Sequence, residues 1–235
     1  MYSFLTINFF ELLAAMAGSL YLKSNNKIEV KIFVWFLWFS FINELVFGWL
    51  PSFVRDYDTF AFLKDTIFEF NLWIYNVVII VKFIIYSIFF YSFIPNNFTR
   101  KILKYGVVLF VLYSIIYLIT TKSLFISVSA PTYILGSFFL LLIVLIYFIE
   151  VLKSEEILNF KRTLPFYIAI GALVFHLTVT PLFIYLKFYR SKNASFVEIY
   201  QIILTAANIF MYTCYTLGFI ICSQYKKISQ EKRSY

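Results

Sequence analysis

Residues 133–152 read YILGSFFLLLIVLIYFIEVL, and this stretch decides the fold class of the chain. Glu150 is its only charged residue, and it lies close to the end of the stretch. About 20 mostly apolar residues in an α-helix cross the roughly 30 Å hydrocarbon core of a bilayer. The stretch therefore predicts a membrane-spanning helix.

The rest of the chain repeats this pattern, with short polar gaps between the apolar stretches. The 235 residues are 62% hydrophobic and only 14% charged, whereas a soluble domain is about half apolar and about a quarter charged. This composition excludes a soluble globule, a disordered chain and a disulfide scaffold. We therefore expect an all-α fold, a seven-helix transmembrane bundle over residues 1–222 with a basic cytoplasmic tail at 223–235. The expected spans are 4–22, 32–50, 70–94, 102–121, 133–152, 165–187 and 199–222.

Lysine and arginine in the connections predict the orientation of the bundle. With the N-terminus outside, the cytoplasmic segments would hold 13 of the 20 basic residues and the outer segments 6, while Lys82 lies inside a span. Cytoplasmic loops carry the excess of positive charge in most membrane proteins. The charge distribution therefore favours an outer N-terminus and a cytoplasmic C-terminus. The longest connection, 51–69, alternates apolar and charged residues, which predicts a short interfacial helix.

A faint internal repeat appears when the chain is shifted by 130 residues. Leu22-Lys23-Ser24 then falls on Leu152-Lys153-Ser154, and Pro51 falls on Pro181. The repeat would relate spans one to three to spans five to seven in parallel, with span four as the linker. Such a 3+1+3 plan is one of the plans that transporters use, although shared Phe, Leu and Lys usage would also produce these matches.

Four ionisable residues lie inside the expected spans: Glu11, Glu44, Lys82 and His176. Ionisable groups are costly in hydrocarbon and commonly mark functional sites. With a rise of ~1.5 Å per residue, all four fall in one outer-to-middle layer of the bundle. We therefore expect Lys82 to pair with Glu11, Glu44 or both, because an unpaired charge at this depth is expensive.

Uncharged polar residues extend the candidate site along two helices. On the last span Gln201, Asn208 and Tyr212 share a face, and Asn76 on the third span is a further candidate. The eight candidates for a ligand or coupling site are therefore Glu11, Glu44, Lys82, His176, Asn76, Asn208, Gln201 and Tyr212. Such residues also serve as interhelical contacts without any ligand, each worth about 0.6 kcal/mol, and the sequence leaves both interpretations open.

The chain carries none of the common catalytic or metal-binding motifs. A single histidine and two cysteines on one expected helix, Cys214 and Cys222, do not form a zinc site of ordinary spacing. Neither a nucleophile elbow nor a phosphate-binding glycine loop occurs. We expect no enzymatic activity, no cofactor, no metal site and no nucleic-acid partner. The expected partners are the lipid bilayer, a small-molecule ligand, and a membrane or cytoplasmic protein.

Three short motifs resemble the membrane portions of known proteins. Asn8-Phe9-Phe10-Glu11, Asn43-Glu44 and residues 71–76, NLWIYN, are similar to uncharacterised seven-helix bacterial membrane proteins, some of them like the membrane modules of sensor kinases. Asn76 and Asn208 resemble the paired asparagines that line the pocket of the SWEET and PQ-loop transporters. The chain departs from that second family because it contains no Pro-Gln dipeptide and lacks internal prolines in spans one and five.

Two functions from different classes follow from these observations. The first is a non-enzymatic sensory, signalling or partner-binding module of a bacterial inner membrane, with a polar pocket in its outer half. The alternative is a small-solute transporter of SWEET-like 3+1+3 organisation. Alternating access often uses glycine and proline to bend helices, and the chain has only 6 Gly and 5 Pro. This scarcity favours the first interpretation.

Overall fold

The computed structural model of the chain describes residues 2–186 and 194–231, and all regular elements within these ranges are helices. Seven of the described helices are long and apolar enough to cross a membrane. The expectation of an all-helical protein with seven candidate membrane spans is therefore confirmed. These spans are Ser3–Leu22, Ile28–Asp56, Leu72–Tyr91, Asn97–Thr120, Ala130–Lys153, Leu164–Tyr185 and Val197–Tyr225.

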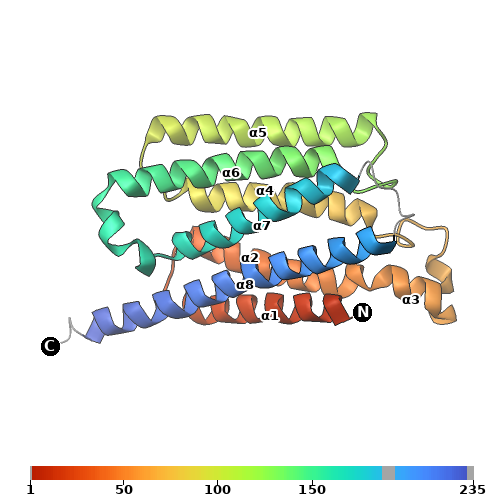
Figure 1. Cartoon of the computed structure of the whole chain (residues 1–235), viewed down its shortest axis with the longest axis horizontal. Coiled ribbons are helices and arrows are strands. Elements are labelled where there is room, and N and C mark those ends of the chain that lie inside the picture. Colours follow the sequence, from red (N-terminus) through yellow and green to blue (C-terminus); the bar gives the residue numbers. More distant parts are fainter. Residues whose placement is uncertain (1, 187–193, 232–235) are drawn as a thin grey trace.

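The contacts between helices join six of them into a closed ring. The remaining helix, α5, lies at one edge of the bundle (Figure 1). Going round the ring, each helix packs on the next, and α8 closes the ring on α1. Helix α5 (Asn97–Thr120) lies outside, against α4 and α6. The ring consists of α1 (Tyr2–Leu22), α2 (Ile28–Asn43), α4 (Leu72–Tyr91), α6 (Ala130–Lys153), α7 (Leu164–Leu186) and α8 (Ala194–Glu231).

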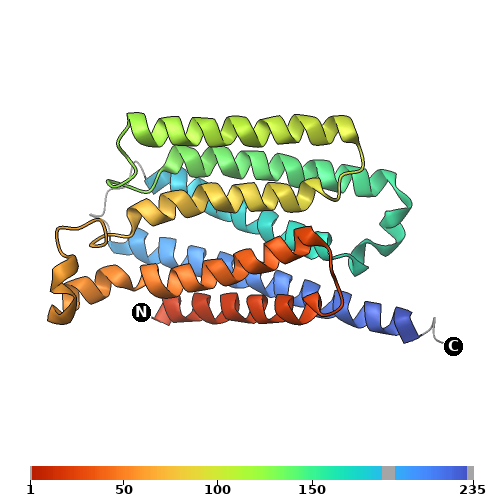
Figure 2. The ribbon, with the colours of Figure 1, turned by 180° about the vertical axis from the view of Figure 1, so that it is seen from behind.

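The two ends of the bundle carry different connections (Figures 1 and 2). The end that holds the N-terminus, called here the N-terminal end, also holds the connections 57–71 and 121–129. The opposite end, the C-terminal end, holds the connections 23–27, 92–96 and 154–163, together with the last turns of α8. The connections 23–27, 92–96 and 154–163, which the charge distribution assigns to the cytoplasmic side, thus lie at one end of the described part of the chain.

The second span is longer than its sequence predicts. Helix α2 passes into a π-helical turn, η1 (Glu44–Gly48), and then into α3 (Leu50–Asp56). The prediction of an interfacial helix over 51–69 is therefore wrong: the first part of this segment continues the span, and the next part forms a short 3₁₀ turn, η2 (Asp58–Leu63). Pro51 does not stop the helix because it occupies the first turn of α3, where its missing N–H is not needed.

Side-chain caps fix the starts of α5, the helix outside the ring, and of α6. The side chain of Asn96 accepts hydrogen bonds from the backbone N–H groups of Phe98 and Thr99, at 2.9 and 3.3 Å. Ser129 accepts one from the N–H of Thr132, and proline occupies the first turn of α6. These caps satisfy backbone donors that have no partner inside their own helix.

Aromatic side chains fill the centre of the ring toward the C-terminal end. Phe33 of α2 lies 5.6 Å, between ring centroids, from both Tyr86 of α4 and Tyr215 of α8. The hydroxyl groups of Tyr86 and Tyr215 share a hydrogen bond of 2.5 Å, and both side chains are at most 1% exposed. Together with Phe89 and Phe219, which are fully buried, these residues form what we call the ring core.

Candidate functional site

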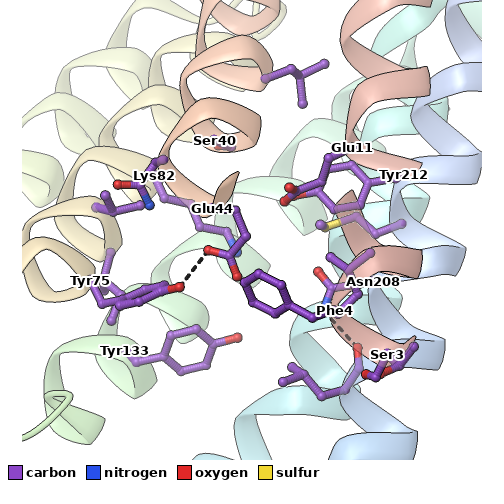
Figure 3. Close-up of a pocket in the computed structure, with 18 of the residues that line it drawn as sticks. Ser3, Phe4, Glu11, Ser40, Glu44, Tyr75, Lys82, Tyr133, Asn208 and Tyr212 are labelled. Atoms are coloured by element: carbon purple, nitrogen blue, oxygen red, sulfur yellow. Dashed lines mark hydrogen bonds between the residues drawn. The ribbon is translucent and has the colours of Figure 1, made fainter. Parts of the chain in front are cut away.

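A cavity of about 540 Å³ lies inside the ring between the N-terminal end and the ring core. Residues of α1, α2, α4 and α8 line it, with Tyr133 contributed by α6 (Figure 3). Its floor includes Tyr86 and Met211, and Ser3 and Gln201 line it near the N-terminal end. We call it the polar cavity because its lining includes Ser3, Glu11, Ser40, Asn43, Glu44, Tyr75, Lys82, Tyr86, Tyr133, Tyr200, Gln201, Thr205, Asn208 and Tyr212.

Glu11 places a carboxylate deep in the wall that α1 forms. It lies eight residues from Ser3, which corresponds to about 12 Å along the helix, and its side chain is only 6% exposed. The hydroxyl of Tyr212 on α8 donates a 2.6 Å hydrogen bond to Oε1 of Glu11. The other oxygen, Oε2, is buried without a hydrogen-bond partner. Half of this carboxylate is therefore left unsatisfied by the protein.

Glu44 owes its position to the π-helical turn that begins with it. A π turn inserts one residue into a helix and shifts the faces that follow, and such turns are frequent at functional sites. Asn71 stabilises the turn by donating its side-chain amide to the carbonyl oxygen of Phe47, at 2.9 Å. The Tyr75 hydroxyl donates a 2.7 Å hydrogen bond to Oε2 of Glu44. Each acidic residue of the cavity thus has one tyrosine partner.

Lys82 shares the cavity with both glutamates but does not form an ion pair with either. Within the described residues, the one ion pair with a nitrogen–oxygen distance of 4.0 Å or less joins Arg55 to Asp56 at the surface. The expected pairing of Lys82 with Glu11 or Glu44 is therefore wrong for direct contact. The Nζ atom of Lys82 instead lies 4.5 Å from the centroid of the Phe175 ring, a cation–π contact with α7. The long, flexible lysine side chain makes this contact with the neighbouring helix possible.

The polar face of α8 lines the cavity as its spacing predicts. Gln201, Thr205, Asn208 and Tyr212 all contribute to the lining. Thr205 and Asn208 each donate a hydrogen bond to a backbone carbonyl of the preceding turn of α8, Gln201 and Leu204 respectively. The side-chain amide nitrogen of Asn208 is therefore used within its own helix.

Asn76 is not part of the cavity, although the sequence makes it a candidate. It is 1% exposed, and its amide group organises the connection between α5 and α6. Its Nδ2 donates to the carbonyl oxygens of Leu124 and Ser127, each at 3.0 Å, and its Oδ1 accepts from the backbone N–H of Ser129 at 2.8 Å. Asn76 and Asn208 therefore do not line the cavity together, because the Asn76 amide is hydrogen-bonded to the backbone of the 121–129 connection.

His176 also lies outside the cavity, in a fully buried position behind Tyr133. Its Nδ1 is 3.0 Å from the Ser137 hydroxyl and 3.3 Å from the Tyr133 hydroxyl, while Nε2 has no hydrogen-bond partner. The ring of Phe83 lies 5.3 Å away between centroids. His176 thus packs among aromatic rings and supports the cavity wall rather than lining it.

Several lining residues are absent from the sequence-based site. Ser40 lies four residues before Glu44, so helical spacing would have found it, and Asn43 precedes Glu44 directly. Phe4, Tyr133 and Tyr200 are aromatic residues near span ends, where such residues usually face the membrane interface. Only the closure of the ring reveals that these three face inward.

The chain was compared with protein-family models, with curated proteins and with solved structures. No protein-family model, no curated protein and no solved structure matches the chain.

Proposed function

We propose that this integral membrane protein is a non-enzymatic sensory or partner-binding module whose polar cavity receives a small molecule. The observation that carries the proposal is the polar cavity itself. It combines charged and hydrogen-bonding groups from α1, α2, η1, α4, α6 and α8 with a volume typical of small-molecule sites, about 300–1,000 Å³. Buried polar groups of this kind are expensive in a membrane and are retained where they contact a ligand or a pathway.

The ring core supports sensing over transport. Tyr86, at the floor of the cavity, is hydrogen-bonded to Tyr215, and Phe33, Phe89 and Phe219 fill the space beyond with fully buried rings. A solute in the cavity would have to displace this packing to reach the C-terminal end. Close-packed interiors resist such displacement, which favours a site that binds without passing its ligand on.

The proposed orientation places the cavity in the outer half of the membrane, with the N-terminus outside and the C-terminus in the cytoplasm. The excess of basic residues in the segments of the C-terminal end supports it. A reporter that is active only in the cytoplasm, fused after Tyr235, should be active, and the same reporter inserted in the 121–129 connection should be silent. The reverse pattern would refute the orientation.

One observation favours the transporter alternative. The ring splits into two sets of three consecutive helices, α1, α2 and α4 against α6, α7 and α8, while α5 lies outside. A 3+1+3 parallel repeat requires an arrangement of this kind, and such repeats build several transporter families.

Binding and transport are separated by two measurements on the same protein. Purified protein in lipid nanodiscs is first screened for thermal stabilisation by a panel of amines, amino acids, organic acids and sugars, since a ligand that binds only the folded state raises its stability. Each hit is then tested for flux in proteoliposomes against empty liposomes. Stabilisation without flux supports the proposal, flux establishes transport instead, and a panel without any hit counts against a ligand site.

A further inference from the structure

The charges of the polar cavity do not balance within the protein. Glu11 and Glu44 contribute two carboxylates, and Lys82 is the one lysine or arginine among the lining residues. Each carboxylate receives a single hydrogen bond from a tyrosine, and Oε2 of Glu11 has no partner. Figure 3 shows the carboxylates of Glu11, on α1, and of Glu44, in the turn that continues the neighbouring α2, directed into the same space.

Lys82 does not satisfy these carboxylates, because its ammonium group lies on the ring of Phe175. A cation over an aromatic face is stabilised without a counter-ion in contact. This contact leaves the two acidic side chains available to a second positive group. With all three side chains ionised, a ligand that carries one positive charge would make the cavity electrically neutral.

The walls around the carboxylates fit an organic cation better than a bare ion. Phe4, Tyr75, Tyr133 and Tyr200 present aromatic rings to the cavity, and such rings attract ammonium groups. Neighbouring contacts hold some of these rings in place: Tyr133 stacks on Phe183 at 3.9 Å between centroids, and Phe4 meets Trp49 edge-on at 5.2 Å. An amine that also carries an apolar group would bury that group against them.

We propose that the polar cavity binds a small primary amine with an apolar or aromatic substituent, its ammonium group held between Glu11 and Glu44. This inference rests on the proposed ligand-binding function and specifies the class of ligand. The ammonium donates to the free oxygen of Glu11 and to Glu44, while the substituent lies among the rings toward the N-terminal end.

The test uses 2-phenylethylamine as the probe, with three matched compounds. The neutral 2-phenylethanol keeps the shape without the charge, phenylalanine adds a carboxylate, and sodium chloride supplies an inorganic cation. Protein in nanodiscs is titrated with each compound at neutral pH and constant ionic strength, and the apparent Kd is taken from thermal stabilisation. We expect the amine to bind at least about tenfold more tightly than the alcohol, because a charge-assisted hydrogen bond contributes about that factor or more.

Single substitutions test which side chains bind the amine. Glu11→Gln and Glu44→Gln should each weaken amine binding by about tenfold or more. Glu150→Gln, at the C-terminal end of α6 and outside the cavity, is the matched control and should leave the Kd unchanged. The comparison of amine with alcohol is made on the unmodified protein, so the test remains decisive if a variant fails to fold.

The failures of the two proposals are distinguishable. Equal binding of amine and alcohol, or binding of sodium that competes with the amine, would overturn the amine assignment while leaving a ligand site. Tighter binding of phenylalanine that disappears in Lys82→Met would assign a zwitterion instead. If the amine does not bind but another member of the wider panel does, the ligand class is wrong. If no compound of either set binds, the proposed function itself fails.

Discussion

Replacement of Asn76, a buried residue outside the cavity, should destabilise the protein strongly. Asn76→Ala removes three well-formed hydrogen bonds, two to the carbonyl oxygens of Leu124 and Ser127 and one from the N–H of Ser129. Each such bond contributes about 1 kcal/mol net, so the loss is about 3 kcal/mol. For chains of 150–250 residues, 1 kcal/mol corresponds to about 2–4 °C in Tm, which gives a decrease of about 6–12 °C.

The measurement is thermal unfolding in nanodiscs, followed by the reaction of a thiol-sensitive dye with the buried Cys222. Asn97→Ala, in the exposed first turn of α5, is the control and should change the Tm little. Asn76→Leu keeps most of the side-chain volume but none of the hydrogen bonds, so it should be as damaging as Asn76→Ala. Recovery of the Tm by leucine, or equal Tm values for Asn76→Ala and the control, would refute the hydrogen-bond explanation.

Two further changes test the packing of the site and of the bundle. Tyr212→Phe removes the single hydrogen bond to Glu11 and should lower the free energy of unfolding by about 1.5–3 kcal/mol. Glu11→Gln should lower that free energy less in the Tyr212→Phe background than in the unmodified protein. Additive losses in this double-mutant cycle would contradict the coupling of the two residues. Gly136→Ala places a methyl group directly against the buried ring of Phe83 and should cost about 1–3 kcal/mol. Gly106→Ala meets only the far edge of a half-buried ring and should be milder, so equal unfolding temperatures for the two glycine variants would argue against this packing.

The sequence was sufficient to predict the spans because hydropathy alone decides which segments can enter a membrane. Six of its eight candidate residues line the cavity, since polar residues at helical spacing must turn away from lipid: Glu11, Glu44, Lys82, Gln201, Asn208 and Tyr212.

Three features could not be predicted, for separate physical reasons. A side-chain amide such as that of Asn76 can form hydrogen bonds with a ligand or with a loop. The sequence does not show that the 121–129 connection lies beside Asn76 and takes up these hydrogen bonds. The partner of Lys82 depends on where a flexible side chain comes to rest, and a neighbouring aromatic ring competes with the carboxylates. The π-helical turn at Glu44 has no local sequence signal, because it is stabilised from outside by Asn71.

The length of α8 connects the polar cavity to the C-terminal end of the bundle through one continuous helix. The helix runs without proline from Ala194 to Glu231, about 57 Å, against a hydrocarbon thickness of about 30 Å. Its first half lines the cavity and its last turns extend past the neighbouring helices (Figure 1). From Asn208 to Glu231 the lever arm is about 35 Å, so a tilt of about 5° at the cavity would move the far tip by about 3 Å, on the scale of the helix shifts that switch other proteins.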